Sequence, residues 1–145
     1  LGLVDNQLSV AISYIAINLP FATWMLKGFF DSISIEIEEA AFIDGMGPAQ
    51  SFLKIMLPLS LPGIATVAIF TFNNCWNEYM LASVFLRSNE LQTMTIGLQM
   101  FQVQNNADWS TMMAASTIAL IPSIIFLVFM QKYIVQGLTA GAVKG

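Results

Sequence analysis

The stretch EEAAFIDGMGPAQSFLKIMLPLSLPG, residues 38–63, places two short helix-forming patterns around a glycine, between two long apolar segments. Acidic residues gather before and inside the first pattern, where negative charge suits the positive end of a helix dipole. Gly45 is expected to end this helix, because glycine adopts a positive φ angle at no steric cost. Pro48 suits the first turn of a second helix, so the stretch predicts a helix–turn–helix unit.

The apolar segments on either side are long enough to cross a membrane. Three windows contain no charged residue, and they cover residues 6–26, 55–77 and 109–131, which are 21, 23 and 23 positions long. A bilayer core of about 30 Å requires about 20 helical residues, so we predict three transmembrane helices. The predicted spans are about 8–30, 61–86 and 109–133, and the other segments are the connector 31–57, the loop 87–108 and the tail 134–145.

The composition supports the same fold class. Of the 145 residues, 57% are hydrophobic and 10% are charged, whereas about 25% of the residues of an average soluble domain carry charge. A soluble domain of this length has too few polar groups to cover so much apolar surface. The prediction is therefore an all-α membrane protein in contact with the lipid bilayer. The net charge of −4 and the lack of a basic cluster argue against nucleic-acid binding.

The chain lacks the residues of common catalytic and metal sites. It has no histidine and one cysteine, Cys75, so we predict no catalytic residue, no metal site and no internal disulfide. No phosphate-binding GxxxxGK[ST] pattern is present, so the chain is not expected to hydrolyse ATP itself. Because the sequence starts at Leu1 without a positively charged leader, we expect residues 1–145 to be one fragment of a longer protein.

The basic residues predict how the spans are oriented. Lys27 and Lys54 flank the connector, Lys132 and Lys144 follow the third span, and Arg87 alone lies on the opposite side. Cytoplasmic loops carry an excess of Lys and Arg. The connector 31–57 and the tail 134–145 are therefore predicted to be cytoplasmic, and the loop 87–108 external.

The charge of the connector bears on what it contacts. Five of its residues are acidic and one, Lys54, is basic, whereas helices that lie on the anionic inner leaflet usually carry Lys and Arg. A protein partner with basic residues fits this pattern better than lipid does. Ala40 and Ala41 are expected to form a small surface that allows a partner to approach closely. A lipid-facing anchor remains the alternative.

The connector resembles the EAA loop of ABC-transporter permeases. The family pattern is Glu-Ala-Ala, three residues, Gly, nine residues, Ile, one residue and Leu-Pro. Every spacing is matched here, by Glu39, Ala40, Ala41, Gly45, Ile55, Leu57 and Pro58. The resemblance implies a cytoplasmic coupling helix that docks in a groove of the ATP-hydrolysing subunit. Ser34 departs from the proline that relatives often carry before the acidic helix, and serine is also a good first residue for a helix.

Further stretches resemble one branch of this family. LPFATWMLKGFFDSI, NNCWNEYMLASVFL and GLTAGAVKG are similar to carbohydrate-uptake permeases, close to the smaller permease of maltose-type importers. The resemblance covers nearly the whole chain but only the later half of such a permease. It implies a location in the cytoplasmic membrane of a prokaryote and three kinds of partner: a dimer of ATP-binding subunits, a second permease and an external solute-binding protein. It implies no cofactor for this chain, because ATP binds the partner.

Three polar residues in the second predicted span are candidates for solute contact. Ionisable residues inside a span are costly and are functional by default, and Asn74, Asn77 and Glu78 are expected to share one helix face. They line either a solute pathway, where amides and carboxylates bind sugar hydroxyl groups, or a contact between helices. For the whole chain, the alternatives to a sugar permease are a permease for a non-sugar solute and a three-span scaffold protein.

Overall fold

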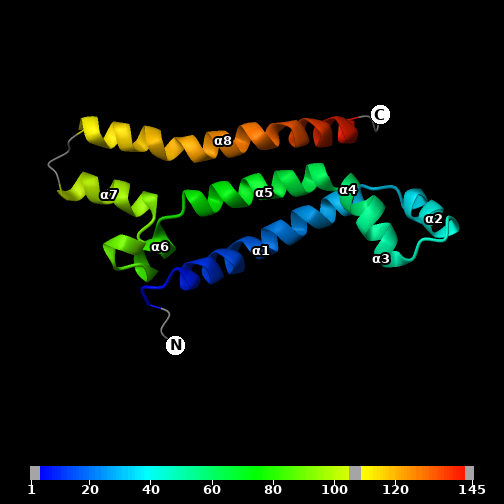
Figure 1. Cartoon of the computed structure of the whole chain (residues 1–145), viewed down its shortest axis with the longest axis horizontal. Helices are drawn as coiled ribbons and strands as arrows, with labels where there is room; N and C mark the ends of the chain where they lie inside the picture. Colours follow the sequence, from blue (N-terminus) through cyan, green and yellow to red (C-terminus); the bar gives the residue numbers. More distant parts are fainter. Residues whose placement is uncertain (1–3, 105–108, 143–145) are drawn as a thin grey trace. The chain divides into compact units, whose positions relative to one another are not determined.

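The structure, a computed structural model, describes residues 4–104 and 109–142, with side chains for 4–101 and 109–133. The described residues form helices and connecting turns and contain no strand (Figure 1). The helices are α1 (Gln7–Asp31), α2 (Ile35–Ile43), α3 (Pro48–Ser51), the π-turn η1 (Phe52–Met56), α4 (Leu57–Leu59), α5 (Leu61–Trp76), α6 (Met80–Phe85), the 3₁₀ turn η2 (Asn89–Leu91), α7 (Met94–Gln104) and α8 (Trp109–Ala142). The all-α prediction is confirmed.

Two helices among the described residues are long and apolar enough to cross a membrane on their own. They are Gln7–Asp31 and the Trp109–Tyr133 part of α8, each 25 residues long. A third span exists if Pro48–Leu59 and Leu61–Trp76, which meet at 66°, count as one broken span. These helices confirm the predicted membrane class. α1 and the Trp109–Tyr133 part of α8 overlap the segments 8–30 and 109–133, whose bounds as membrane spans stay a prediction.

The second expected span, 61–86, is not one continuous helix. The helix that starts at Leu61 ends at Trp76, and a separate helix runs from Met80 to Phe85. The prediction of a continuous span was therefore wrong at residues 77–79. The loop expected at 87–108 also has regular structure, because η2 and α7 lie within it.

The chain divides into two compact units, which are described separately. Unit 1 contains residues 1–19 and 71–128, and unit 2 contains residues 20–70 and 129–145. The core of unit 1 brings together the first part of α1, α6 and α7. Its buried members are Val10, Ala82, Leu86 and Ile96.

In unit 2, the end of α1 and the start of α5 approach each other closely. A Cβ atom added to the buried Gly63 would lie 2.2 Å from Cγ of Phe29, so only glycine fits at this crossing. Aromatic pairs extend the contact on both sides. The ring of Phe21 meets that of Phe70 edge-on at 6.2 Å, and the rings of Phe30 and Phe52 lie 6.0 Å apart.

Candidate functional site

The connector begins with helix α2 of unit 2, whose two ends are formed by local hydrogen bonds. Ser34 caps the start, since its Oγ accepts from the N–H of Glu36 at 3.4 Å. At the other end Gly45 has a φ of +82°. Its N–H donates to the carbonyl of Phe42 at 3.0 Å, and the N–H of Met46 donates to the carbonyl of Ala41 at 3.0 Å. This pair of bonds is the Schellman motif. The prediction that Gly45 ends the helix is confirmed.

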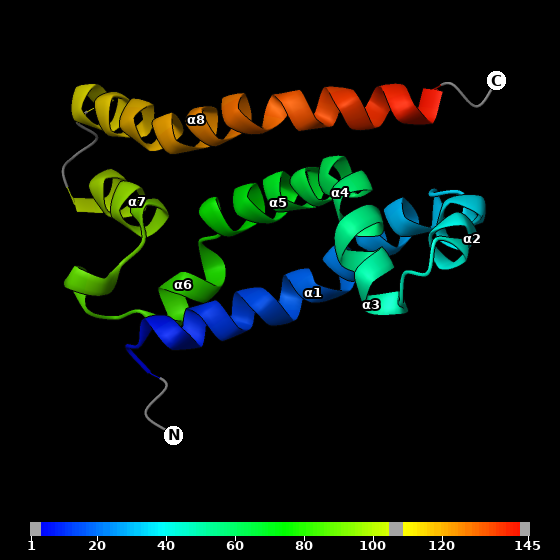
Figure 2. The ribbon, with the colours of Figure 1, turned by 45° about the vertical axis from the view of Figure 1, so that its right-hand side comes forward.

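The second half of the connector is a helical path from Pro48 to Leu59 with a π-turn in its middle. Gly47 has an extended backbone at its start, and Pro48 occupies the first turn, as expected from the sequence. α2 contacts α3, and Figures 1 and 2 show the two helices next to each other. Ala41 of α2 and Ser51 of α3 are 2% and 1% exposed, so small residues fill the interior of the connector.

The residues of the EAA pattern differ in exposure. Glu39, Ala40, Gly45 and Pro58 are exposed, and Ile55 and Leu57 are half-buried. Ala41 is buried, so the expectation that it forms one surface with Ala40 was wrong. Neighbouring residues of a helix point about 100° apart, because a turn takes 3.6 residues. Ala40 is therefore available to a partner, whereas Ala41 belongs to the inside of the connector.

The outer surface of the connector combines unpaired acids with exposed apolar side chains. The carboxylates of Glu36, Glu39 and Asp44 are exposed and make no hydrogen bond or ion pair with any other described residue. Beside them, Ile35 is 68% exposed and Ile43 is 86% exposed. A surface that is acidic and apolar at once suits a protein partner with basic side chains better than it suits water.

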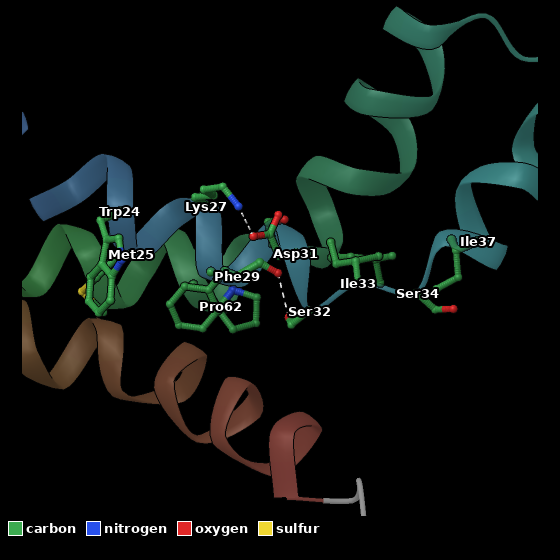
Figure 3. A pocket seen from close by; sticks show the side chains of 14 residues that line it. Trp24, Met25, Lys27, Phe29, Asp31, Ser32, Ile33, Ser34, Ile37 and Pro62 are labelled. Atoms are coloured by element: carbon green, nitrogen blue, oxygen red, sulfur yellow. Dashed lines mark hydrogen bonds and ion pairs between the residues drawn. The ribbon is translucent and has the colours of Figure 1, made fainter. Parts of the chain in front are cut away.

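A cavity of about 780 Å³ lies in unit 2 beside the connector (Figure 3). Its walls are mostly apolar and include Trp24, Ile33 and Pro62. Lys27 and Asp31, one turn apart on α1, form an ion pair at its edge. No residue of the EAA pattern lines it. Nothing in the sequence pattern had indicated it, because its lining comes from four separate helices, α1, α2, α4 and α5. Its mostly apolar lining can accept an apolar group.

In unit 1, two asparagines link α1 and α5. Nδ2 of Asn74 donates to Oδ1 of Asn18 at 2.8 Å. Nδ2 of Asn18 in turn donates to the carbonyl of Tyr14 at 2.8 Å and to Sγ of Cys75 at 3.4 Å. Asn18 is buried, so the pair satisfies polar groups that would otherwise be costly inside the protein.

Glu78 lies where three helices of unit 1 meet. Its Oε2 accepts from the hydroxyl of Tyr14 at 2.9 Å and from the N–H of Ala82 at 3.1 Å, and its Oε1 accepts from the N–H of Leu81 at 2.7 Å. Its backbone carbonyl accepts from Thr95 Oγ1 at 2.9 Å. The two N–H groups belong to the first turn of α6, so the carboxylate starts a new helix and explains the break after Trp76.

Asn74, Asn77 and Glu78 therefore do not form the single face that was expected. Asn74 and Glu78 bond to residues of α1, whereas Nδ2 of Asn77, which is exposed and follows α5, donates to the carbonyl of Asn73 in that helix at 2.8 Å. The face was predicted from an unbroken helix, and the helix ends at Trp76. Within 4–104 and 109–142, no three His, Cys, Asp or Glu side chains come together as metal ligands do.

The family model of binding-protein-dependent transport system inner membrane components matches residues 2–140. The inner membrane ABC transporter permease protein YcjP of Escherichia coli is 39% identical over the whole chain, which covers 52% of that protein. The trehalose/maltose transport system permease protein MalG of Thermococcus litoralis is 38% identical, again over the whole chain and 52% of that protein.

The name of a third relative contains another sugar. The diacetylchitobiose uptake system permease protein DasC of Streptomyces coelicolor is 38% identical over 99% of the chain, which covers 52% of that protein. The chain thus spans about half the length of these relatives.

Proposed function

This chain belongs to the family of binding-protein-dependent transport system inner membrane components, and from that premise we propose that it acts in a permease subunit of an ABC importer. The subunit translocates a carbohydrate across the cytoplasmic membrane, and a separate subunit hydrolyses the ATP. The partners in this proposal are a dimer of ATP-binding subunits, a second permease and an external solute-binding protein. The names of the trehalose/maltose and diacetylchitobiose permeases support the choice of a carbohydrate.

The observation that carries the proposal is the surface of the connector. Its acids Glu36, Glu39 and Asp44 have no partner among the described residues, and isoleucines beside them are largely exposed. Both features disappear if the connector docks in a basic groove of an ATP-binding subunit. In this role Glu39, Ala40 and Gly45 contact the groove, and Ile55, Leu57 and Pro58 transmit its motion to α5.

The proposed topology follows the distribution of basic residues. The connector 31–57 and the tail 134–145 lie in the cytoplasm, and the loop 87–108 lies outside. Single cysteines introduced at the exposed Gln50 and Glu90, with Cys75 replaced, test this arrangement. An impermeant thiol reagent added to intact cells should label only position 90. Labelling at position 50 under these conditions would contradict the topology.

Solute contact is the second part of the proposal. Asn74, Asn77 and Glu78 lie along the solute pathway, where Asn77 contacts the solute and the other two hold the wall in place. The hydrogen bonds of Asn74 and Glu78 within the protein support this division. The alternative is a permease for a non-sugar solute, and uptake of sugars against uptake of an amino acid distinguishes the two.

The test is uptake by the complete transporter in proteoliposomes. Trehalose, maltose and diacetylchitobiose should each be offered with the binding protein and internal ATP, next to an amino acid as a non-sugar control. We expect ATP-dependent uptake of at least one sugar and none of the amino acid. Uptake of the amino acid alone would keep the permease assignment and overturn the carbohydrate.

A further inference from the structure

A second cavity lies entirely within unit 1, between the end of α5, the start of α7 and α8. Its volume is about 230 Å³, which is below the range of about 300–1,000 Å³ that is typical for drug-sized ligands. It accommodates one sugar ring but not a disaccharide. The lining side chains are those of Trp76, Asn77, Met94, Thr95, Leu98, Ser116, Ala119, Leu120 and Ser123.

The indole of Trp76 is a rigid wall of this cavity. Its Nε1–H donates to the carbonyl of Ala119 at 3.1 Å. The ring of Phe72 stacks against it, with centroids 5.7 Å apart and planes 17° from parallel. With the polar edge and the stacking partner both fixed, the ring offers the cavity a flat apolar surface.

The polar groups of the lining are placed to bind hydroxyl groups. Ser123 makes no hydrogen bond with any other described residue, and Oδ1 of Asn77 is likewise without one, since only its Nδ2 is used. Thr95 and Ser116 donate their protons to the carbonyls of Glu78 and Met112. Because Thr95 also accepts from Thr93 Oγ1 at 2.9 Å, it keeps one free lone pair, and Ser116 keeps both. The lining contains no charged side chain, so it suits a neutral ligand that donates several hydrogen bonds.

We propose that this cavity binds one ring of the transported carbohydrate. The inference rests on the proposed function and adds to it the place where a sugar contacts this chain. One face of a pyranose ring is formed by C–H groups, which pack on the indole, and its hydroxyl groups reach Asn77, Thr95 and Ser123. A lipid chain would cover the indole but leave these polar atoms unpaired, which is unfavourable. A longer sugar would place its rings here one after another.

Cysteine protection in the complete transporter tests occupancy directly. Ser123→Cys is introduced after Cys75→Ser, and alkylation by N-ethylmaleimide is followed with and without trehalose, maltose or diacetylchitobiose. A transported sugar at ten times its dissociation constant should slow the reaction by about tenfold. Thr117→Cys is the matched control, because Thr117 lies on the same helix, is exposed and does not line the cavity. Its alkylation should not respond to sugar.

A second measurement keeps the test independent of the cysteine. Asn77→Ala and Ser123→Ala should each raise the KM for the sugar severalfold, whereas Thr117→Ala should leave it unchanged. If a sugar is transported but neither protection nor a change in KM is found, or if position 117 is protected equally, the cavity is only a packing gap and the proposed function stands. If none of the three sugars is transported, the carbohydrate assignment fails and the cavity assignment fails with it.

Discussion

Unit 1 and the connector of unit 2 both carry carboxylates, and they use them in opposite ways. In unit 1 the carboxylate of Glu78 accepts three hydrogen bonds, from Tyr14 and from two backbone N–H groups. On the connector, the carboxylates of Glu36 and Glu39 bond to no other described residue. An acid whose bonds are made inside the chain stabilises the chain. An acid left exposed beside large apolar side chains is available to a partner.

This difference predicts two kinds of mutational effect. Changes on the connector should impair coupling to the ATP-binding subunit while the spans still fold. Changes inside unit 1 should lower stability while coupling is intact.

The largest effect is expected from Gly45→Val. A left-handed backbone costs an L-residue about 1–2 kcal/mol, and a β-branched side chain at φ +82° adds to that cost. The turn between α2 and α3 should change, and sugar uptake by the complete transporter should fall to background while membrane insertion is normal. Gly47→Val is the control, because Gly47 has a negative φ of −76° and open space around its Cβ position. Normal uptake by a correctly inserted Gly45→Val protein would contradict the proposed role.

Glu39→Lys should have the next largest effect, on the affinity for the ATP-binding subunit. An exposed ion pair contributes about 1 kcal/mol or less, whereas removing one partner of a desolvated interfacial pair costs roughly 2–5 kcal/mol. Glu39→Ala should therefore weaken binding by at least about tenfold, and Glu39→Lys by more, because it brings like charges together. Co-purification with the ATP-binding subunit measures this loss.

The control for Glu39 is Glu90→Lys, which makes the same charge change at an exposed residue of η2, outside the connector. It should leave co-purification unchanged. An acidic substitution in the groove of the ATP-binding subunit should partly restore binding of the Glu39→Lys protein. If no such substitution does so, the connector docks by shape rather than by charge.

Gly63→Ala tests whether unit 2 also has positions that affect only stability. The new Cβ would lie 2.2 Å from Cγ of Phe29, and overpacking of this kind costs about 1–3 kcal/mol. The melting temperature of the purified transporter should fall, and Phe29→Ala should recover part of the loss. Gly28→Ala and Gly97→Ala are controls, because nothing lies within 4 Å of their Cβ positions. An unchanged melting temperature for Gly63→Ala would mean that the helices separate easily at this crossing.

Glu78→Gln should lower stability by less. Hydrogen bonds between helices in membranes contribute about 0.6–2 kcal/mol each, and the amide NH₂ of glutamine cannot accept the bonds that one carboxylate oxygen accepts now. Because the carboxylate is occupied by Tyr14 and α6, we expect a lower melting temperature and an unchanged preference among sugars. Tyr14→Phe removes the same bond from the other side, so the effects of the two changes should not add. A changed preference at unchanged stability would instead place Glu78 in contact with solute.

The sequence predicted the local features of the fold well and the long-range ones poorly. The end of α2 at Gly45 and the start at Ser34 depend on residues within a few positions of each other, so their types suffice to predict them. The break before α6 combines local bonds from the N–H groups of Leu81 and Ala82 to the Glu78 carboxylate with a bond from Tyr14, which is 64 positions away. The burial of Ala41 and both cavities likewise depend on which helices meet. One sequence contains little information on such contacts, so the predicted span 61–86 and the shared polar face were wrong.

Asp5→Asn should have the smallest effect, and its size depends on pH. The hydroxyl and N–H of Ser88, followed by the N–H of Arg87, donate hydrogen bonds to the Asp5 carboxylate and hold its pKa below the usual value. A lowered pKa stabilises the folded state above the unfolded pKa of about 3.9, and this stabilisation is lost as the pH falls through the folded pKa. Asparagine tolerates the φ of 60° at this position, so the substitution tests the charge alone.

At pH 7, amide hydrogen exchange at Arg87 and Ser88 should be faster in the variant than in the wild type, and the difference should shrink once the wild-type carboxylate is protonated. Glu90→Gln should show no such difference. If the exchange rates of Asp5→Asn and the wild type differ by the same factor at pH 7 and at a pH where the wild-type carboxylate is protonated, the turn at residues 86–88 does not depend on the ionised carboxylate.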